Sequence, residues 1–263
     1  MSVLLCVADA EVMGITQLHD VVYIVCYKSS AIIRFDAVTH ERLTDIIVKN
    51  LILPLDIAAC QQTAQLYVVG DAGCVWRVSS DGEDVKRLLP KSSSDTFCPY
   101  TLSVTSSRLL VTSRYFAKQL RQFDTVGDEL RRVDLADDME PLHAMESPTG
   151  TFIVSHRNTQ LKQYQVSEVN TGGQVLRQFS GSRLLPLGLT PHVAVDSQGS
   201  IFVAARDNGV ILLLDSQLAL RRVIIEEHQP SIYKRPRYLC YVEQSGRLLV
   251  GMWFDRDVKV FDV

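Results

Sequence analysis

The side chains with the clearest potential for chemistry are cations that stand beside aromatic rings, in segments that read as loops. A large ring gains about 1.5–3 kcal/mol from burial, so a ring at a loop tip forgoes that stabilisation. Arginine, tyrosine and tryptophan are also the residues most enriched at interaction hot spots. The pattern therefore predicts a contact surface. Its predicted ligand-binding residues are Tyr27, Lys28, Arg114, Tyr115, Phe116, His156, Arg157, Arg206, Lys234, Arg235, Arg237, Tyr238, Trp253, Phe254 and Arg256.

Sequence motifs of catalysis are absent. The chain has no phosphate-binding glycine loop, no GxSxG and no HExxH. The acidic run at Asp137, Asp138 and Glu140 is interpreted as a solvated loop, because charge runs are usually surface features. The six histidines are scattered, and an isolated histidine is more often structural than a ligand. We therefore expect a protein that is not an enzyme and has no catalytic residue.

Composition narrows the class of protein further. The net charge of −3 over 263 residues argues against a uniformly basic nucleic-acid binder but permits a basic patch on one face. The six cysteines lie in or beside apolar runs without zinc-site spacing, which predicts free thiols in a reducing compartment. No signal-peptide pattern and no apolar run of about 18 residues is present, so we expect a cytoplasmic protein with no membrane contact.

A six-fold repeat organises the chain. Each copy contains a large apolar residue followed by an apolar run that ends in valine. The copies lie at residues 23–25, 67–69, 109–111, 152–154, 201–203 and 248–250. The steps between the closing valines are 44, 42, 43, 49 and 47 residues. This spacing is typical of the blades of a β-propeller, each built from about four short strands.

The other strands of each unit, which we name A to D in order, follow from the same alignment. The repeated valine run is strand B, a second run that often closes with aspartate is strand C, and a third is strand D. The predicted fold is all-β, one six-bladed β-propeller domain over residues 1–263. Its antiparallel, four-stranded blades span 8–48, 52–90, 98–135, 140–180, 190–226 and 235–263. The last unit lacks a strand D, and residues 2–7 are predicted to supply it and close the ring.

The fifth unit resembles the NHL repeat. Its matching residues are Pro191, Asp196, Gly199, the run Ile201, Phe202 and Val203, and the turn Asp207, Asn208 and Gly209. The sixth unit is similar, whereas the first four share the spacing and few of the signature residues. The resemblance implies a propeller similar to the C-terminal domain of tripartite-motif NHL proteins. Several NHL domains of that family bind RNA, so the resemblance also makes RNA a candidate ligand. RING, B-box and coiled-coil segments are absent from this sequence.

Strand alternation assigns the loops to two faces. The B–C and D–A loops share one face and carry the predicted ligand-binding residues, whereas the C–D loops are acidic. We therefore predict a recognition module, monomeric as this chain, that binds a protein or peptide through the B–C and D–A face. An acidic or phosphorylated segment would suit the arginines. RNA bound on the same face is the alternative, against which the net negative charge weighs.

The propeller axis offers a third function, that of a metal-dependent hydrolase or lyase. Such propellers hold an ion with polar side chains from several inner strands. The inner segments of this chain supply Asp56, His143 and His192, without a set of carboxylates and amides. The sequence therefore predicts no metal site and no cofactor.

Overall fold

The computed structural model describes residues 3–6, 11–70, 73–89, 97–113, 117–181, 185, 187–188, 192–225, 235–253 and 257–263. Within these ranges the regular structure is β-strand apart from one 3-10 turn, η1 (Arg206–Asn208). None of the described segments forms a helix that is long and apolar enough to cross a membrane.

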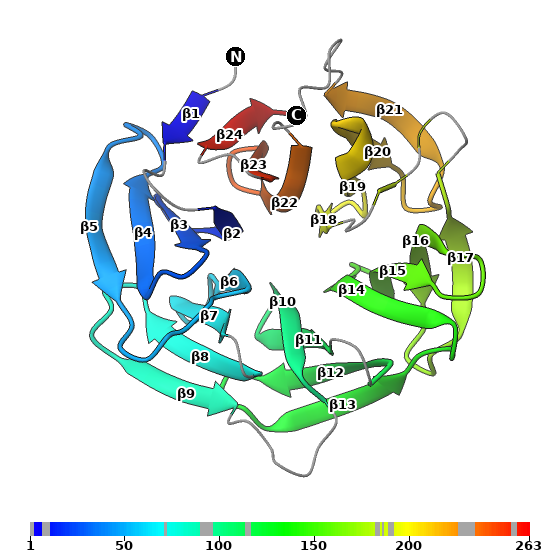
Figure 1. Ribbon diagram of the computed structural model, residues 1–263, viewed down its shortest axis with the longest axis horizontal. Coiled ribbons are helices and arrows are strands. Elements are labelled where there is room, and N and C mark those ends of the chain that lie inside the picture. The colour runs from blue at the N-terminus through cyan, green and yellow to red at the C-terminus, as the bar shows by residue number, and fades with distance from the viewer. Residues whose placement is uncertain are drawn as a thin grey trace.

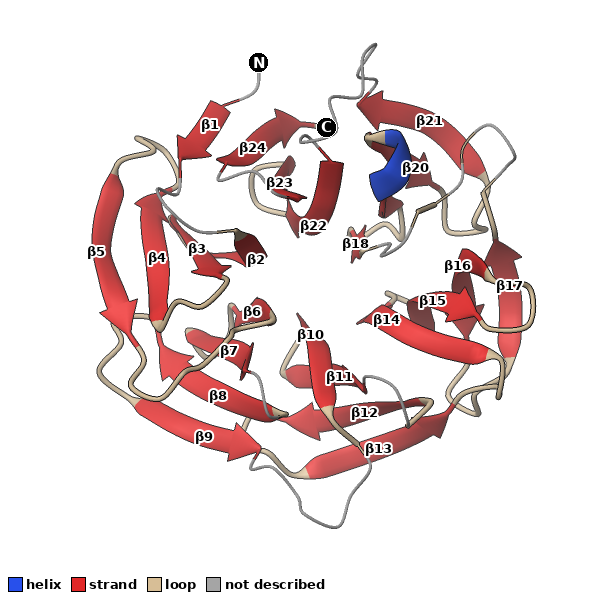
Figure 2. Cartoon of the chain, in the orientation of Figure 1, coloured by secondary structure: helices blue, strands red, loops and turns tan. Residues whose placement is uncertain are grey.

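The strands form six antiparallel sheets of four, arranged as blades around a central axis (Figures 1 and 2). The prediction of a six-bladed β-propeller is confirmed. The first three blades are β2 (Val12–Leu18), β3 (Val21–Cys26), β4 (Ala31–Asp36) and β5 (Arg42–Ile47); β6 (Asp56–Cys60), β7 (Gln65–Gly70), β8 (Cys74–Ser79) and β9 (Val85–Leu89); and β10 (Pro99–Thr105), β11 (Arg108–Ser113), β12 (Gln119–Asp124) and β13 (Glu129–Asp134).

The remaining blades follow the same order from the axis outwards. They are β14 (Met139–Glu146), β15 (Phe152–Asn158), β16 (Gln163–Val169) and β17 (Val175–Phe179); β18 (Val193–Val195), β19 (Ile201–Ala205), β20 (Val210–Leu214) and β21 (Leu220–Ile225); and β22 (Arg235–Val242), β23 (Arg247–Trp253), β24 (Asp257–Asp262) and β1 (Val3–Cys6).

Burial explains which strand takes which place in a blade. The B strands, such as β3 and β19, are apolar along nearly their whole length and are buried on both faces between neighbouring blades. The outermost D strands, such as β13 and β17, are largely exposed. The core therefore lies between adjacent blades and leaves the innermost strands, β2, β6, β10, β14, β18 and β22, around the axis (Figure 1).

The N-terminal strand closes the ring as predicted. β1 pairs antiparallel with β24, in a register that runs from Val3 opposite Val260 to Cys6 opposite Asp257. Leu5 is buried in the same apolar cluster as Val258 and Val260. This pairing covers the edge of β24, which would otherwise expose unpaired backbone groups.

The five cysteines whose side chains are described, Cys26, Cys60, Cys74, Cys98 and Cys240, are free thiols.

Candidate binding face and axial site

A strip of cationic side chains crosses the face formed by the B–C and D–A loops. We define this basic strip as Lys28, Arg157, Arg206, Arg235 and Arg237. Lys28 follows β3, Arg157 lies near the end of β15, and Arg206 begins η1 directly after β19. Arg235 and Arg237 lie at the start of β22. Because the B strands end and the A strands begin at the same face of a propeller, these five residues share that face.

The strip begins where blade 1 meets blade 6. Tyr27 is 43% exposed, and the Lys28 Nζ lies 5.2 Å from the centre of its ring. The backbone N–H of Tyr27 donates to the Glu11 carbonyl over 2.8 Å. The Glu11 carboxylate in turn accepts from Arg237 Nη1 over 2.9 Å. One chain of contacts therefore links the exposed ring to the arginines of blade 6.

Arginines from blades 5 and 6 then converge on one carboxylate. Asp207 Oδ1 lies 3.5 Å from Arg235 Nη1 and 3.7 Å from Arg206 Nε. Burial lowers the pKa of Arg206, Asp207 opposes that shift, and the positive charges of Arg237 and Arg235 lower the pKa further. These three guanidinium groups are therefore close enough to repel one another.

The strip ends in blade 4, where exposed Arg157 lies 3.6 Å from the Glu140 carboxylate. Among the described residues, the four arginines of the strip form ion pairs with three carboxylates, those of Glu11, Glu140 and Asp207. The same face also carries Asp138 and the Lys118–Asp137 pair, so the excess of cations is confined to the strip itself.

Three predicted binding residues are buried, which corrects the expectation that they stand in exposed loops. His156, Arg206 and Tyr238 are 1%, 5% and 5% exposed. β15 continues through His156, whose Nε2 lies 2.9 Å from the Ser167 hydroxyl of the next strand. Tyr238 belongs to β22, and its hydroxyl is directed towards Met13 Sδ at 3.9 Å. His156 and Tyr238 therefore serve the core, whereas Arg206 still contributes its charge near the surface.

Other predicted residues lie outside the described ranges, and their binding role stays a prediction. They are Arg114, Tyr115, Phe116, Lys234, Phe254 and Arg256, together with the side chain of Trp253.

A second group of polar residues gathers at the axis. We define the axial layer as Asp56, His143 and His192, which lie respectively at the first position of β6, within β14, and directly before β18. One carboxylate oxygen and one nitrogen from each imidazole all lie within 4.8 Å of one another, and all three residues are buried. Three separate blades therefore contribute to one polar cluster.

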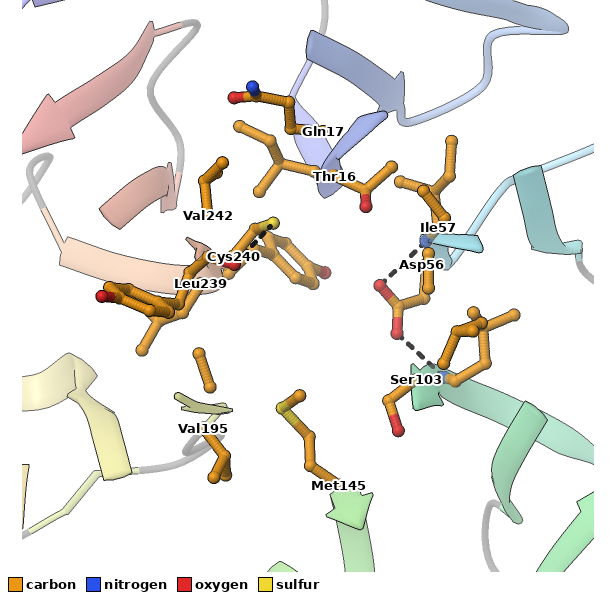
Figure 3. Close-up of a pocket in the computed structure, with 18 of the residues that line it drawn as sticks. Thr16, Gln17, Asp56, Ile57, Ser103, Met145, Val195, Leu239, Cys240 and Val242 are labelled. Atoms are coloured by element: carbon orange, nitrogen blue, oxygen red, sulfur yellow. Dashed lines mark hydrogen bonds between the residues drawn. The ribbon is translucent and has the colours of Figure 1, made fainter. Parts of the chain in front are cut away.

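Backbone groups hold the Asp56 carboxylate. Its Oδ1 accepts from the Ile57 N–H over 2.9 Å and its Oδ2 from the Leu102 N–H over 3.0 Å (Figure 3). Burial raises the pKa of Asp56 to about 7, although these two hydrogen bonds act to lower it. Gly14 allows the neighbouring strand to approach, because a Cβ there would lie 2.8 Å from Ile57 N and 3.1 Å from Asp56 Oδ1.

The two histidines of the layer are stacked, with ring centres 3.6 Å apart and planes inclined by 25°. Burial lowers the pKa of His143 to about 3 and holds the pKa of His192 well below its usual value, so both rings are neutral near pH 7. The Leu239 N–H donates to His192 Nδ1 over 3.4 Å. No described group pairs with His143 Nδ1 or His192 Nε2, and both atoms are buried.

The axial layer separates two hollows. A cavity of about 200 Å³ lies on the side of the A–B loops, and its wall includes Gln17, Ser103 and Met145 (Figure 3). A cavity of about 30 Å³ lies on the side of the basic strip and includes Tyr100 and Arg237. Both are lined by His143, His192 and Tyr238. The larger hollow therefore opens opposite the face predicted for binding.

The repeat contains a signal for the two histidines of this layer and for Tyr238 beside them. The closing valines of units four, five and six pair with Ala144, Val193 and Leu239. His143, His192 and Tyr238 are the residues directly before those partners. Aligning the inner strands on the paired valines would have placed these three side chains at one level of the axis.

Comparisons with known proteins agree on the fold. No protein-family profile matches the sequence, and no curated protein is similar to it. Hydrazine synthase of Kuenenia stuttgartiensis is similar in structure, with a TM-score of 0.68 and 14% identity, over 97% of this chain and 97% of that one. Virginiamycin B lyase of Staphylococcus aureus, in a catalytically inactive form with quinupristin, gives a TM-score of 0.69 and 13% identity, over 97% of this chain and 82% of that one.

A nidogen–laminin complex contains a third similar propeller, with a TM-score of 0.67 and 16% identity, over 87% of this chain and 84% of that one. The chain is therefore a six-bladed β-propeller with neighbours that include enzymes and a component of a protein complex. At identities of 13–16% the likeness defines the fold alone.

Proposed function

We propose that this propeller is a non-catalytic, NHL-like recognition module that binds a protein or peptide partner through the basic strip. The observation that carries the proposal is the strip itself, which gathers five cations from four blades on one side of a chain with negative net charge. The free thiols are compatible with a reducing compartment, which supports the cytoplasmic location that we also propose.

The chemistry of the strip favours an acidic or phosphorylated segment. A guanidinium group can bind a carboxylate or phosphate through two parallel hydrogen bonds, which are stronger than neutral ones. Arg206 and Arg235 both lie beside the carboxylate of Asp207, and an incoming anion would reduce the repulsion among the arginines. The exposed ring of Tyr27 beside Lys28 offers an apolar contact at one end of the strip.

Charge reversal at the two exposed ends of the strip tests this proposal. Lys28→Glu combined with Arg157→Glu should weaken binding of a fluorescent glutamate-rich phosphopeptide pool by about tenfold or more, measured by anisotropy at physiological salt. The control is Lys86→Glu with Arg131→Glu, the same change of charge on the outer strands β9 and β13. Equal binding by both variants would contradict the proposal.

Binding of a randomised RNA pool, measured in parallel, distinguishes RNA from a protein or peptide as the ligand of this face. Tighter binding to RNA than to the peptides, with an affinity that falls steeply as salt rises, would replace the protein partner by RNA.

A further inference from the structure

We propose that Asp56, His143 and His192 form a binding site for a divalent transition-metal ion of the zinc class on the propeller axis. This inference is independent of the partner proposed for the basic strip, because it rests on side chains on the axis between the two faces. Three blades converge on the site, and the three ligand atoms already lie within 4.8 Å of one another.

The donor set suits such an ion. Zinc binds imidazole nitrogen and carboxylate oxygen at about 2.0–2.2 Å, and zinc sites open to a further ligand use three protein ligands. Neutral imidazoles are the form that binds a metal, and both rings of the layer are neutral near pH 7. One carboxylate and two neutral rings would leave the bound ion with a net positive charge.

Two buried nitrogens provide an independent observation. His143 Nδ1 and His192 Nε2 are buried and have no partner in the described structure. Polar atoms buried without a hydrogen bond are uncommon in native proteins, and an absent ion is one recognised explanation. Asp56 supports the same interpretation, because its buried carboxylate is held by backbone N–H groups and pairs with no described cation.

Metal binding requires a local rearrangement. The lone pair of an imidazole lies in the plane of the ring, so two rings stacked at 3.6 Å and 25° do not point at one ion. At least one ring must turn. His192 is the candidate, because its one hydrogen bond in the described structure, from the Leu239 N–H, is long at 3.4 Å. While Nδ1 accepts the hydrogen bond from Leu239, the neutral ring of His192 carries its proton on Nε2. A metal ion bound by Nε2 requires that proton to move to Nδ1, which can then no longer accept the hydrogen bond from Leu239.

The larger cavity determines what else the ion could hold. With three protein ligands, a zinc-class ion keeps a coordination position for water or another oxygen ligand. The cavity of about 200 Å³ meets the layer on the A–B side and provides room for it. The ligand class that fits is a small molecule with a carboxylate or carbonyl oxygen, which would enter opposite the basic strip.

Zinc itself is the probe that tests this site. The chain, stripped of metal by a chelator, should bind one Zn²⁺ with an affinity that falls by at least about tenfold in His143→Gln and in His192→Gln, measured by calorimetric titration and elemental analysis. The control is His19→Gln with His40→Gln, which removes two histidines from surface turns while keeping the axial layer. Co²⁺ should give a visible absorption spectrum that the axial variants lose and the control retains.

A measurement on the unaltered chain covers the case in which an axial variant fails to fold. X-ray absorption of the zinc-loaded protein should show two histidine ligands together with oxygen. Failure of the unaltered chain to bind zinc, an equal loss of binding in the surface control, or a zinc shell without two histidines would overturn the proposal.

Discussion

His156 shows how burial at a single residue determines both charge and accessibility. Its ring lies between strands of blade 4, and burial lowers its pKa to about 4. The sequence places it beside Arg157, which is exposed, and nothing in that pair of residues distinguishes the buried side chain from the exposed one. The distinction arises from the surroundings of β15, which extends to Asn158 and is buried at every position except Arg157.

The low pKa of His156 predicts how stability depends on pH. In the unfolded chain the pKa of His156 has the ordinary value of 6.5, whereas in the folded chain it is about 4. The contribution of the neutral ring to stability is therefore fully present above pH 6.5 and is lost as the pH falls towards 4. His143 acts in the same sense. Asp56 acts oppositely, because its folded pKa of about 7 exceeds its unfolded value of 3.8, so its contribution is lost as the pH rises from 4 to 7.

His156→Gln should therefore reduce the pH dependence of the free energy of unfolding. Between pH 4.5 and 6, the slope should fall by about 1.4 kcal/mol per pH unit, the value for one proton. Urea unfolding at several pH values measures it. His19→Gln controls for the loss of a histidine at an exposed position. An unchanged slope in His156→Gln would mean that the buried ring is not the titrating group.

At the scale of the strand and its turn, a recurring aspartate explains part of the repeat. Asp36, Asp124 and Asp215 stand at or next to the end of their C strands. The side-chain oxygen of each accepts hydrogen bonds from backbone N–H groups of the C–D turn that follows. The acidic character of these loops thus has a structural cause, because aspartate stabilises turns in this way.

Asp124→Ala should destabilise the third blade. Its Oδ1 accepts from the N–H groups of Val126, Gly127 and Asp128 at 3.0, 2.8 and 2.9 Å, so the variant leaves that turn without its acceptor. We expect a loss of about 1 kcal/mol in the free energy of unfolding, measured by urea denaturation. Asp128→Ala removes one negative charge from the same turn and should lower the free energy of unfolding by less than Asp124→Ala does. Equal losses would indicate that charge, and not turn geometry, is responsible.

At the scale of the whole molecule, the repeat made the architecture predictable. Six valine runs, spaced 42–49 residues apart, defined the blades, and the unpartnered strands at the two ends predicted the β1–β24 pairing that the structure contains. Such features depend on local patterns of apolar residues, which a sequence displays directly. The fold could therefore be predicted almost completely.

The functional sites were less predictable, because they depend on register between blades. The axial layer combines residues 56, 143 and 192, whose side chains meet only because blades 2, 4 and 5 direct equivalent strands towards one axis. The basic strip likewise depends on contacts between blades, such as that of Arg237 with Glu11, which are far apart in sequence. Periodicity within one blade predicts which residues face inwards and contains no information on which of them touch.

The most direct test of partner recognition by the basic strip is to map where a bound peptide lies. A glutamate-rich phosphopeptide with a photo-crosslinking group should label the accessible part of the strip, at residues 27–28, 157 and 235–237, as read by mass spectrometry. Labelling confined to the C–D turns at residues 36–41 and 124–129, on the opposite face, would contradict recognition through the basic strip.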